Sequence, residues 1–330
     1  MPRADRPRTG ALLAGLAAAL LTGCAGPVAD WIVEAPNQRG IAMDAETVDD
    51  MRDQLQGESS ELPTPAGMLR YLRAPPRPYD VTMRTWVVGE TRGGGLETVT
   101  TWIFRPADER QPVVEPRGTV VLLHGFMLVK EIMGAFAALL ADAGFDTVLV
   151  DLPGHGESGG DFVTWGVREA PAVNVLRRQL EAEGAARPLI AFGVSLGGSV
   201  AIRAAAEESG WDAVIALQPF EDPARVIPNY RSMAPAWLRF YVSERRIEKA
   251  MNIAEMRGGF AFADAGLAPL LADYAVPTLI EHGRFDSLVP VAESEALAAA
   301  APDAIDLIVS DADHFTLPLF LWERCPTIFS

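Results

Sequence analysis

Residues 189–199 read LIAFGVSLGGS, and the rest of the chain is organised around this stretch. Its apolar run predicts a short strand, and the small and apolar residues that follow predict a helix. A serine at the sharp turn between them must adopt a strained backbone conformation with its hydroxyl exposed, so the residues two places before and after it must be small. Gly193 and Gly197 meet this demand. Ser195 is therefore a candidate nucleophile.

Composition and charge limit the kinds of protein that the chain can be. The 330 residues are 49% hydrophobic and 22% charged, which is enough for one large α/β domain, or two small ones, with a sizeable buried core. The formal net charge of −16 leaves no basic surplus to neutralise phosphates. We therefore expect no nucleic acid among the partners.

Residues 1–23 have the character of a secretory signal peptide. Arginines lie near the start, an apolar run covers residues 11–21, and small residues follow. The run is too short for a comfortable membrane span. The sequence LTGC at residues 21–24 resembles the lipobox of bacterial lipoproteins. This resemblance implies acylation of Cys24 and a membrane anchor in the bacterial cell envelope, with the outer membrane or periplasmic face favoured. The alternative is an ordinary signal peptide with an incidental cysteine.

The rest of the chain divides by its patterning. Residues 24–78 contain scattered prolines and acids, so we expect a tether and a loosely structured lead-in. Residues 79–220 open with two alternating stretches around Gly93-Gly94-Gly95, which predict a hairpin, and continue as the first part of an α/β core. Residues 221–277 are too long for a structureless loop and predict a helical lid insertion. Residues 278–330 complete the core.

Continuous apolar stretches alternate with helical ones from residue 118 onward. Continuous apolar strands must be buried on both faces, so the pattern predicts an α/β fold with a mostly parallel central sheet and helices on both faces. The expected strands lie at 118–123, 145–150, before Ser195, and at 213–217, 278–282 and 305–310, and the expected helices include 131–143, 168–183 and 291–300.

Five segments have the order and spacing found in the α/β-hydrolase superfamily. They are His124-Gly125-Phe126, residues 151–159, 193–198 and 282–286, and Asp313-His314-Phe315. The chain thus resembles this superfamily over most of its length after the lead-in. The resemblance implies an α/β-hydrolase fold with an inserted lid. It also implies a serine hydrolase of the carboxylesterase or lipase type that needs no cofactor.

A serine at its free pKa is a poor nucleophile and needs a base within hydrogen-bond reach. The chain offers four histidines as candidates. His124 and His155 lie in or beside glycine turns, where we expect them to brace loops, and His282 ends a strand that leads toward the acid. His314 follows the last predicted strand, where the resemblance places the base.

The base in turn needs a buried carboxylate that fixes its tautomer. The resemblance places this acid at Asp286, although Asp286 could instead only cap the helix that starts near Val291. Asp222 is the rival, because some members of the fold carry the acid after the preceding strand. Asp313 is expected to brace its own loop, since neighbours in a chain rarely point toward each other.

A tetrahedral oxyanion needs two backbone N–H donors, which the resemblance supplies from Phe126 and Leu196. Other chemistries fail on residue type. Serine at position 195, in place of aspartate, argues against a dehalogenase of this fold. The sequence contains no zinc-binding helix, P-loop or dinucleotide fingerprint, so we expect no metal and no cofactor.

The leading interpretation is a membrane-tethered serine hydrolase that cleaves small-molecule carboxylic esters, with short- to medium-chain acyl groups, through an acyl-enzyme. An amidase or peptidase of the same fold and a non-catalytic lipoprotein scaffold remain open alternatives, because a fold does not determine a function. Large apolar side chains of the insertion either line the acyl pocket above Ser195 or pack the lid onto the sheet. They are Trp237, Leu238, Phe240, Tyr241, Met251 and Met256.

Overall fold

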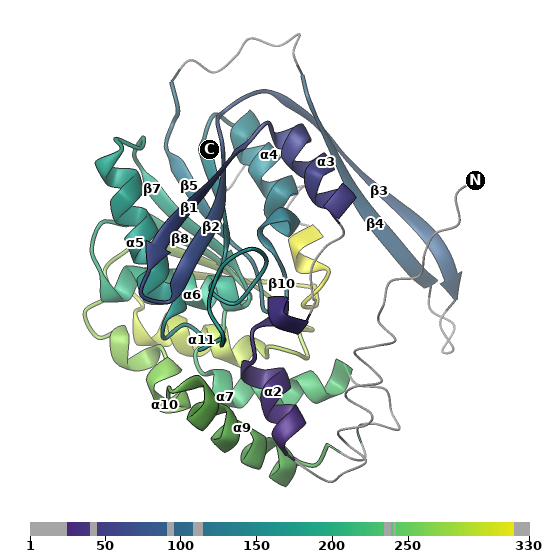
Figure 1. Cartoon of the computed structure of the whole chain (residues 1–330), viewed down its shortest axis with the longest axis vertical. Coiled ribbons are helices and arrows are strands. Elements are labelled where there is room, and N and C mark those ends of the chain that lie inside the picture. The colour runs from purple at the N-terminus through teal and green to yellow at the C-terminus, as the bar shows by residue number, and fades with distance from the viewer. Residues whose placement is uncertain are drawn as a thin grey trace.

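The computed structural model describes residues 25–39, 45–90, 96–107, 115–233, 239 and 242–319. Within this part of the chain, eight strands form one sheet in the order β1-β2-β6-β5-β7-β8-β9-β10, and two more form a separate hairpin. Figure 1 shows helices around the large sheet and the hairpin running out along one side of the body. The strands of the large sheet are β1 Glu58–Thr64, β2 Gly67–Ala74, β5 Thr119–Leu123, β6 Asp146–Asp151, β7 Leu189–Val194, β8 Ala213–Leu217, β9 Thr278–Gly283 and β10 Ile305–Ser310.

The pairing of these strands makes the sheet mostly parallel. Strand β5 lies between β6 and β7, and all neighbours from β6 to β10 run parallel. Strand β2 pairs antiparallel with β6, and β1 pairs antiparallel with β2. The predicted α/β class and mostly parallel central sheet are confirmed.

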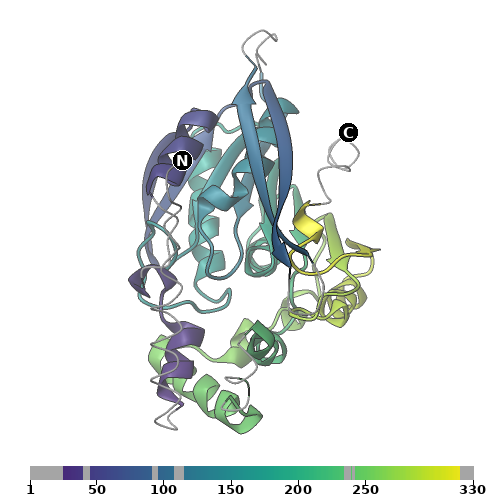
Figure 2. The ribbon, with the colours of Figure 1, turned by 90° about the vertical axis from the view of Figure 1, so that its right-hand side faces the viewer.

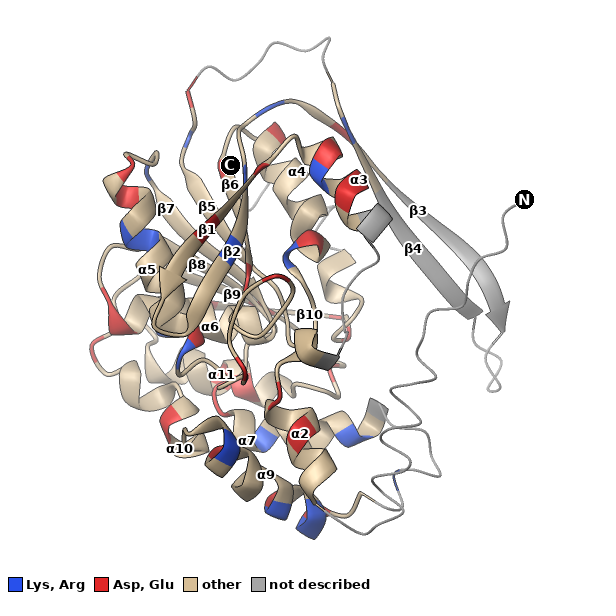
Figure 3. Ribbon diagram, in the orientation of Figure 1, with Lys and Arg blue, Asp and Glu red and all other residues tan. Residues whose placement is uncertain are grey.

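Successive side chains of the central strands enter different cores. Val121 and Leu123 of β5 belong to one buried cluster, whereas Val120 and Leu122 belong to a second cluster on the other face. Because side chains alternate across a strand, a strand covered on both faces must be apolar at every position. The central strands β5, β7 and β8 carry no charged residue, whereas helices, connecting segments and the outer strands β1 and β2 do (Figure 3).

Helices cover both faces of the sheet, as expected. Leu176 of α5 and Val200 of α6 pack in the first cluster, and Ala137 and Leu140 of α4 pack in the second. The α-helices are α2 Gly26–Val33, α3 Ala45–Leu55, α4 Gly134–Asp142, α5 Glu169–Ala182, α6 Leu196–Glu207, α7 Pro223–Val226, α9 Glu244–Gly258, α10 Phe262–Ala265 and α11 Val291–Ala300. Short 3-10 helices are η1 Pro36–Arg39, η2 Lys130–Met133, η3 Ile227–Met233 and η4 Ala268–Leu270.

The predicted hairpin is confirmed as β3 Tyr79–Glu90 and β4 Leu96–Pro106, which pair antiparallel along most of their length. It forms a sheet of its own, and Figure 2 shows it as a long ribbon beside the main sheet. Tyr79 and Phe104 at its base are buried in the second cluster with α4. The expected turn at residues 93–95 lies outside the described residues.

The expectation of a tether and a loosely structured lead-in over residues 24–78 is wrong for much of that segment. Strands β1 and β2 extend the main sheet, and α2 packs against α9. Val28, Ile32 and Val33 of α2 are buried in the first cluster. The prolines of this segment lie outside β2, whose alternating residues Leu69 and Tyr71 point into the core.

The inserted segment of residues 221–277 is helical in its described parts, which comprise α7, η3, α9, α10 and η4. Met251 of α9 is half-buried and packs against the first cluster, whereas Met256 is 75% exposed. Trp237, Leu238, Phe240 and Tyr241 lie outside the described residues. Among the residues that are described, no helix combines the length and apolar character needed to cross a bilayer.

The packing of α2 predicts a stability effect that a tether would not show. Truncating Ile32, which is 1% exposed, to alanine should lower the free energy of unfolding by about 2 to 5 kcal/mol, because it leaves a cavity between α2 and the body. Denaturant unfolding of Ile32→Ala measures this loss. The control is Asp30→Asn on the same helix, which removes only an exposed ion pair with Arg257 and should cost less than about 1 kcal/mol. Equal stabilities for the wild type and Ile32→Ala would contradict the packing.

Candidate active site

Ser195 lies at the turn between β7 and α6, as the sequence predicts. Its backbone has φ 54° and ψ −117°, in the region that side chains rarely adopt. The strain is held by two backbone bonds: the Ser195 N–H donates to the Leu217 carbonyl (2.7 Å), and the Ser195 carbonyl accepts from the Ser199 N–H (3.1 Å). The residue is only 4% exposed, so the expectation of an exposed hydroxyl is wrong. The turn is covered by parts of the chain that the motif does not include.

The glycines on either side of Ser195 are required by close backbone approach. A Cβ at Gly193 would lie 2.1 Å from the Gly197 carbonyl oxygen, and a Cβ at Gly197 would lie 2.2 Å from the Leu123 carbonyl oxygen. Both contacts are with backbone, which cannot move aside. Any larger residue at either position would push α6 away from β5 and β7 and displace the serine.

Asp286 and His314 are brought together from the ends of two neighbouring strands. Asp286 follows β9 and His314 follows β10, and the His314 Nδ1 donates to Asp286 Oδ2 over 2.6 Å. The other carboxylate oxygen accepts from the N–H groups of Leu288 (2.9 Å) and Val289 (2.8 Å). This contact leaves Nε2 of His314 as the nitrogen that can accept a proton.

Ser195 and His314, the expected nucleophile and base, are not hydrogen-bonded to each other. Among the hydrogen bonds of the described residues, those of His314 run to Asp286 and, through its carbonyl, from the Gln218 amide, and none reaches Ser195. Bonds between catalytic groups are often long in the absence of substrate and tighten only in the complex.

The rival acid Asp222 has another role in this structure. Its Oδ1 accepts from the Ala224 N–H (2.8 Å) and caps α7. Asp313 likewise accepts from the N–H groups of Phe315 (3.0 Å) and Thr316 (2.9 Å), which holds the loop that carries His314. Asp286 does not cap α11, because its acceptor bonds close the turn before that helix.

His282 is buried beside the same carboxylate. Its Nε2 donates to the Val289 carbonyl (2.8 Å), its Nδ1 contacts the Ser294 hydroxyl (2.6 Å), and Asp286 Oδ2 lies 3.7 Å from Nε2. Burial lowers the pKa of His282. It therefore packs against the back of the Asp286 loop as a neutral group.

The two expected oxyanion donors face no internal acceptor. Neither the Phe126 N–H nor the Leu196 N–H donates a hydrogen bond within the described part of the chain. Leu196 is the first residue of α6, where N–H groups have no partner in the preceding turn of helix. Such donors are available to a developing negative charge.

Two neutral histidines hold the loop that carries Phe126. The Met127 N–H donates to His155 Nε2 (3.3 Å), and the Leu152 N–H donates to His124 Nε2 (3.1 Å). Both rings are fully buried, and burial lowers the pKa of His124 to about 4 and that of His155 to about 3. The interpretation of these residues as loop braces agrees with these contacts.

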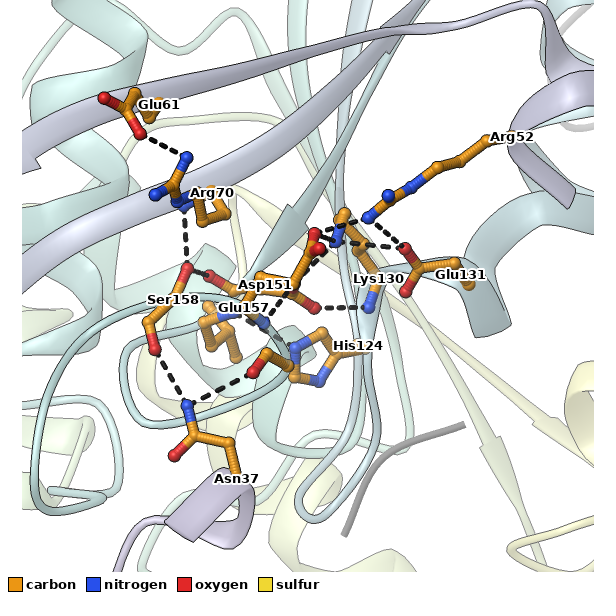
Figure 4. Close-up of polar contacts among 12 residues, drawn as sticks. Asn37, Arg52, Glu61, Arg70, His124, Lys130, Glu131, Asp151, Glu157 and Ser158 are labelled. Atoms are coloured by element: carbon orange, nitrogen blue, oxygen red, sulfur yellow. Dashed lines mark hydrogen bonds and ion pairs between the residues drawn. The ribbon is translucent and has the colours of Figure 1, made fainter. Parts of the chain in front are cut away.

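A buried charge cluster anchors the other end of the same loop, and sequence reasoning missed it. Lys130 Nζ donates to Asp151 Oδ2 (2.7 Å) and to Glu157 (2.7 Å), while its backbone N–H donates to Asp151 Oδ1 (2.8 Å) (Figure 4). Lys130 is 2% exposed and Asp151 is fully buried. A Cβ at Gly156 would overlap the Asp151 carboxylate, which explains that glycine. The signal available was an aspartate ending an otherwise apolar strand.

Aromatic rings pack around the loop that carries Phe126, the expected oxyanion loop. The Phe126 ring contacts Trp31 of α2 (centroids 5.9 Å apart), Trp165 (4.8 Å) and Tyr230 (5.9 Å). Trp31 also contacts Tyr230 edge to face at 5.5 Å. The N-terminal helix and the insertion therefore both reach the site, which the motif pattern alone does not indicate.

Among the described residues, no group of three or more His, Cys, Asp or Glu side chains could hold a metal ion. The expectation that the chain needs no metal or cofactor stays a prediction. What the arrangement does offer is a serine at a strained turn, a histidine with a buried carboxylate partner, and two available N–H donors.

Comparison with known proteins supports this chemistry. Residues 114–258 match the family described as serine aminopeptidase S33. The chain is 27% identical over 229 residues to the pimeloyl-[acyl-carrier protein] methyl ester esterase of Edwardsiella ictaluri. The alignment covers 59% of this chain and 85% of that protein. The chain has the α/β-hydrolase fold and is similar to hydrolases and esterases, which indicates a serine hydrolase.

Solved structures agree on the fold. An esterase from Pyrococcus furiosus superposes with a TM-score of 0.56 at 19% identity, covering 84% of this chain and 93% of that one. The 2,6-dihydroxy-pseudo-oxynicotine hydrolase superposes with a TM-score of 0.58 at 20% identity, covering 86% of this chain and 71% of that one. At these identities the likeness concerns the fold alone.

The buried, neutral histidines predict a pH dependence of stability. In the unfolded chain the pKa of His124 and His155 returns to about 6.5. At pH values between the folded pKa of each histidine and about 6.5, the unfolded chain binds more protons than the folded chain. The free energy of unfolding should therefore rise with pH from about 4 to 6.5, by up to about 1.4 kcal/mol per pH unit for each histidine, and then level off.

Denaturant unfolding of the wild type and His155→Gln between pH 4 and 9 measures this slope. The variant should lose about 1.4 kcal/mol per pH unit of the slope in the acidic range, and its difference from the wild type should be constant above about pH 7. Parallel curves through the whole range would contradict the assignment of a neutral, buried His155.

Proposed function

We propose that this α/β-hydrolase cleaves carboxylic esters through an acyl-enzyme, with Ser195 as nucleophile, His314 as base and Asp286 as the acid that orients it. The observation that carries the proposal is the contact between His314 Nδ1 and the buried Asp286 carboxylate at 2.6 Å, in a chain whose candidate nucleophile, Ser195, is held at positive φ. The backbone N–H groups of Phe126 and Leu196 serve as the oxyanion hole.

In the proposed reaction Ser195 Oγ attacks the ester carbonyl carbon while its proton passes to His314 Nε2. The carbonyl oxygen becomes an oxyanion that accepts from the Phe126 and Leu196 N–H groups. The bond to the alcohol oxygen then breaks, and His314 returns the proton to the leaving group. A water molecule repeats the sequence on the acyl-enzyme, which releases the carboxylic acid and restores the serine hydroxyl.

The triad predicts an ordered set of losses. Ser195→Ala should abolish ester turnover, and His314→Ala should be nearly as severe, because nucleophile and base act as one unit. Asp286→Asn should be damaging but less complete, whereas Asp222→Asn should be mild. Rates on p-nitrophenyl esters and labelling by a fluorophosphonate probe measure these losses. If Asp222→Asn is more harmful than Asp286→Asn, the triad acid is Asp222, which follows β8, and the assignment of Asp286 is wrong.

The same experiment separates the alternatives. The match to a family described as a serine aminopeptidase favours amide hydrolysis as a second candidate. Aminoacyl p-nitroanilides, assayed beside the esters, test this candidate directly, because one triad serves both bonds. A folded wild-type protein that neither takes up the probe nor turns over either substrate would leave the non-catalytic scaffold as the explanation.

We propose a preference for short- to medium-chain acyl groups, which the aromatic rings of Trp31, Phe126 and Tyr230 near the nucleophile support. The value of kcat/KM should rise from acetate to medium-chain p-nitrophenyl esters by no more than about fourfold per methylene, since each buried methylene contributes about 0.8 kcal/mol. A Trp237→Ala variant, compared on the same series, tests the contribution of the insertion. Rates that are highest on acetate and fall steadily with length would contradict this preference.

We also propose that the enzyme is a bacterial lipoprotein anchored in the cell envelope through Cys24. Helix α2 begins at Gly26, so the globular body starts within two residues of the proposed anchor. Cys24→Ser should shift the protein from washed membranes to a soluble fraction. The substitution removes the proposed acylation site, and stable anchoring requires two or more acyl chains. Fractionation and immunoblotting of cells measure this, and a serine variant that stays in the membrane pellet would contradict the anchor.

A further inference from the structure

The side chain of Gln218 holds the loop that carries the proposed base. Its Nε2 donates to the His314 carbonyl over 2.8 Å. Gln218 directly follows β8 and is fully buried, whereas His314 follows β10. Strand β9 lies between these two strands in the sheet. The glutamine therefore reaches past the end of one strand to fix the loop beyond the next.

Gly283, the last residue of β9, leaves room for this reach. A Cβ at Gly283 would lie 3.1 Å from Gln218 Oε1 and 2.5 Å from the Ala312 carbonyl oxygen, which belongs to the segment that leads to His314. The backbone N–H of Gln218 donates to the Glu281 carbonyl of β9 (2.9 Å). The backbone of Gln218 is thus held on β9 while its side chain passes the end of that strand.

The residue before Gln218 holds the proposed nucleophile. The carbonyl of Leu217, the last residue of β8, accepts from the Ser195 N–H over 2.7 Å. Two consecutive residues therefore hydrogen-bond to the backbones of Ser195 and His314. The placement of one relative to the other depends on this dipeptide.

The arrangement of Gln218 is costly for stability. Its φ is 51°, in the region that side chains rarely adopt. Its Nε2 must face the His314 carbonyl, because only the amide nitrogen can donate. This leaves Oε1 buried without a partner among the described residues. Backbone strain and an unpaired buried oxygen both destabilise a fold and are concentrated at functional sites.

We propose that Gln218 is a positioning residue that, through the His314 carbonyl, sets the distance and direction from His314 Nε2 to Ser195 Oγ when substrate is bound. The inference rests on the proposed function, because it needs Ser195 and His314 to act as nucleophile and base. Gln218 itself transfers no proton and forms no bond with the substrate. A base that drifts out of hydrogen-bond reach slows proton transfer without weakening substrate binding.

The first test is Gln218→Met, which removes the donor and keeps a side chain of similar length. We expect kcat on p-nitrophenyl esters to fall by about 10- to 100-fold, as a small misplacement of a catalytic group can cause, with KM changed by less than about threefold. The rate of inactivation by a fluorophosphonate should fall by a similar factor, because that reaction uses the same serine and base.

The second variant, Gln218→Asn, separates the hydrogen bond from the backbone strain. Asparagine adopts positive φ more readily than glutamine, so the strain should not increase. Its amide is one methylene shorter and cannot reach the His314 carbonyl. We expect a loss of kcat similar to that of Gln218→Met with little change in the temperature of thermal unfolding. If Gln218→Met does not fold, this variant decides the question.

Proton NMR provides a readout that a loss of stability alone would not change. The proton between His314 Nδ1 and Asp286 Oδ2, which lie 2.6 Å apart, should give a signal at unusually low field. Its absence in His314→Ala assigns it. In both Gln218 variants this signal should move to higher field or disappear through exchange with water, because the released loop no longer holds the ring against the carboxylate.

The matched control is Asn174→Leu. Asn174 is 2% exposed, and its side-chain amide also donates to a backbone carbonyl, that of Ala204 (3.0 Å), but between α5 and α6. Its carbonyl oxygen accepts from the Trp211 indole (2.9 Å). The substitution should lower the temperature of thermal unfolding and leave both kcat and the low-field signal unchanged.

The outcomes separate this inference from the proposed function. If the wild-type protein neither hydrolyses esters nor reacts with a fluorophosphonate, the proposed function itself fails. If the wild type is active and a folded Gln218 variant keeps kcat within about threefold and the low-field signal in place, only the role of Gln218 is overturned. An equal loss of kcat in Asn174→Leu would also overturn it, because any lost buried amide bond would then slow the enzyme.

Discussion

The fold depends on the close approach of three backbone segments at Ser195. Strand β5, the end of β7 and the start of α6 meet there with no room for a side chain at Gly193 or Gly197. This contact forces the serine to φ 54°, where it places its side chain at the carboxyl edge of the sheet. The carboxyl ends of β5, β9 and β10 lie along the same edge, so the oxyanion loop, Asp286 and His314 are delivered to it by strand order alone.

Once the serine is placed, the rest of the structure supports and buries it. The oxyanion loop is held at one end by His155 and at the other by the buried pair of Lys130 and Asp151. Removing one partner of such a buried pair leaves an uncompensated charge, which is why it tolerates little change. The aromatic rings of Trp31 and Tyr230 cover the site from segments about 200 residues apart in the chain. In the proposed mechanism, burial of this kind strengthens the electrostatic interactions that stabilise the oxyanion.

Sequence patterns predicted what is local and missed what is distant. The strand-turn-helix around Ser195 and the turn that presents Asp286 are short-range features, because glycine spacing and apolar runs encode them directly. The covering of the site by α2 and η3 has no local signature, since it arises from packing between segments far apart in the chain. The expectation of a loosely structured lead-in was wrong for the same reason, because β2 forms a strand by pairing with β6, which lies far from it in the sequence. The prolines of this segment lie outside β2, so they give no indication of the strand.

The four histidines show how burial assigns different roles to one residue type. His124, His155 and His282 are fully buried, and burial lowers the pKa of each, so they stay neutral and accept or donate hydrogen bonds as fixed parts of the scaffold. A base must take up a proton during the reaction, and that requires a nearby carboxylate and some access to solvent. His314 alone among the four has both: its side chain is 11% exposed, and Asp286 lies 2.6 Å away. His282, although close to the same carboxylate, is sealed from solvent and uses its Nε2 proton on a backbone carbonyl. These contacts support the proposal that His314 is the base.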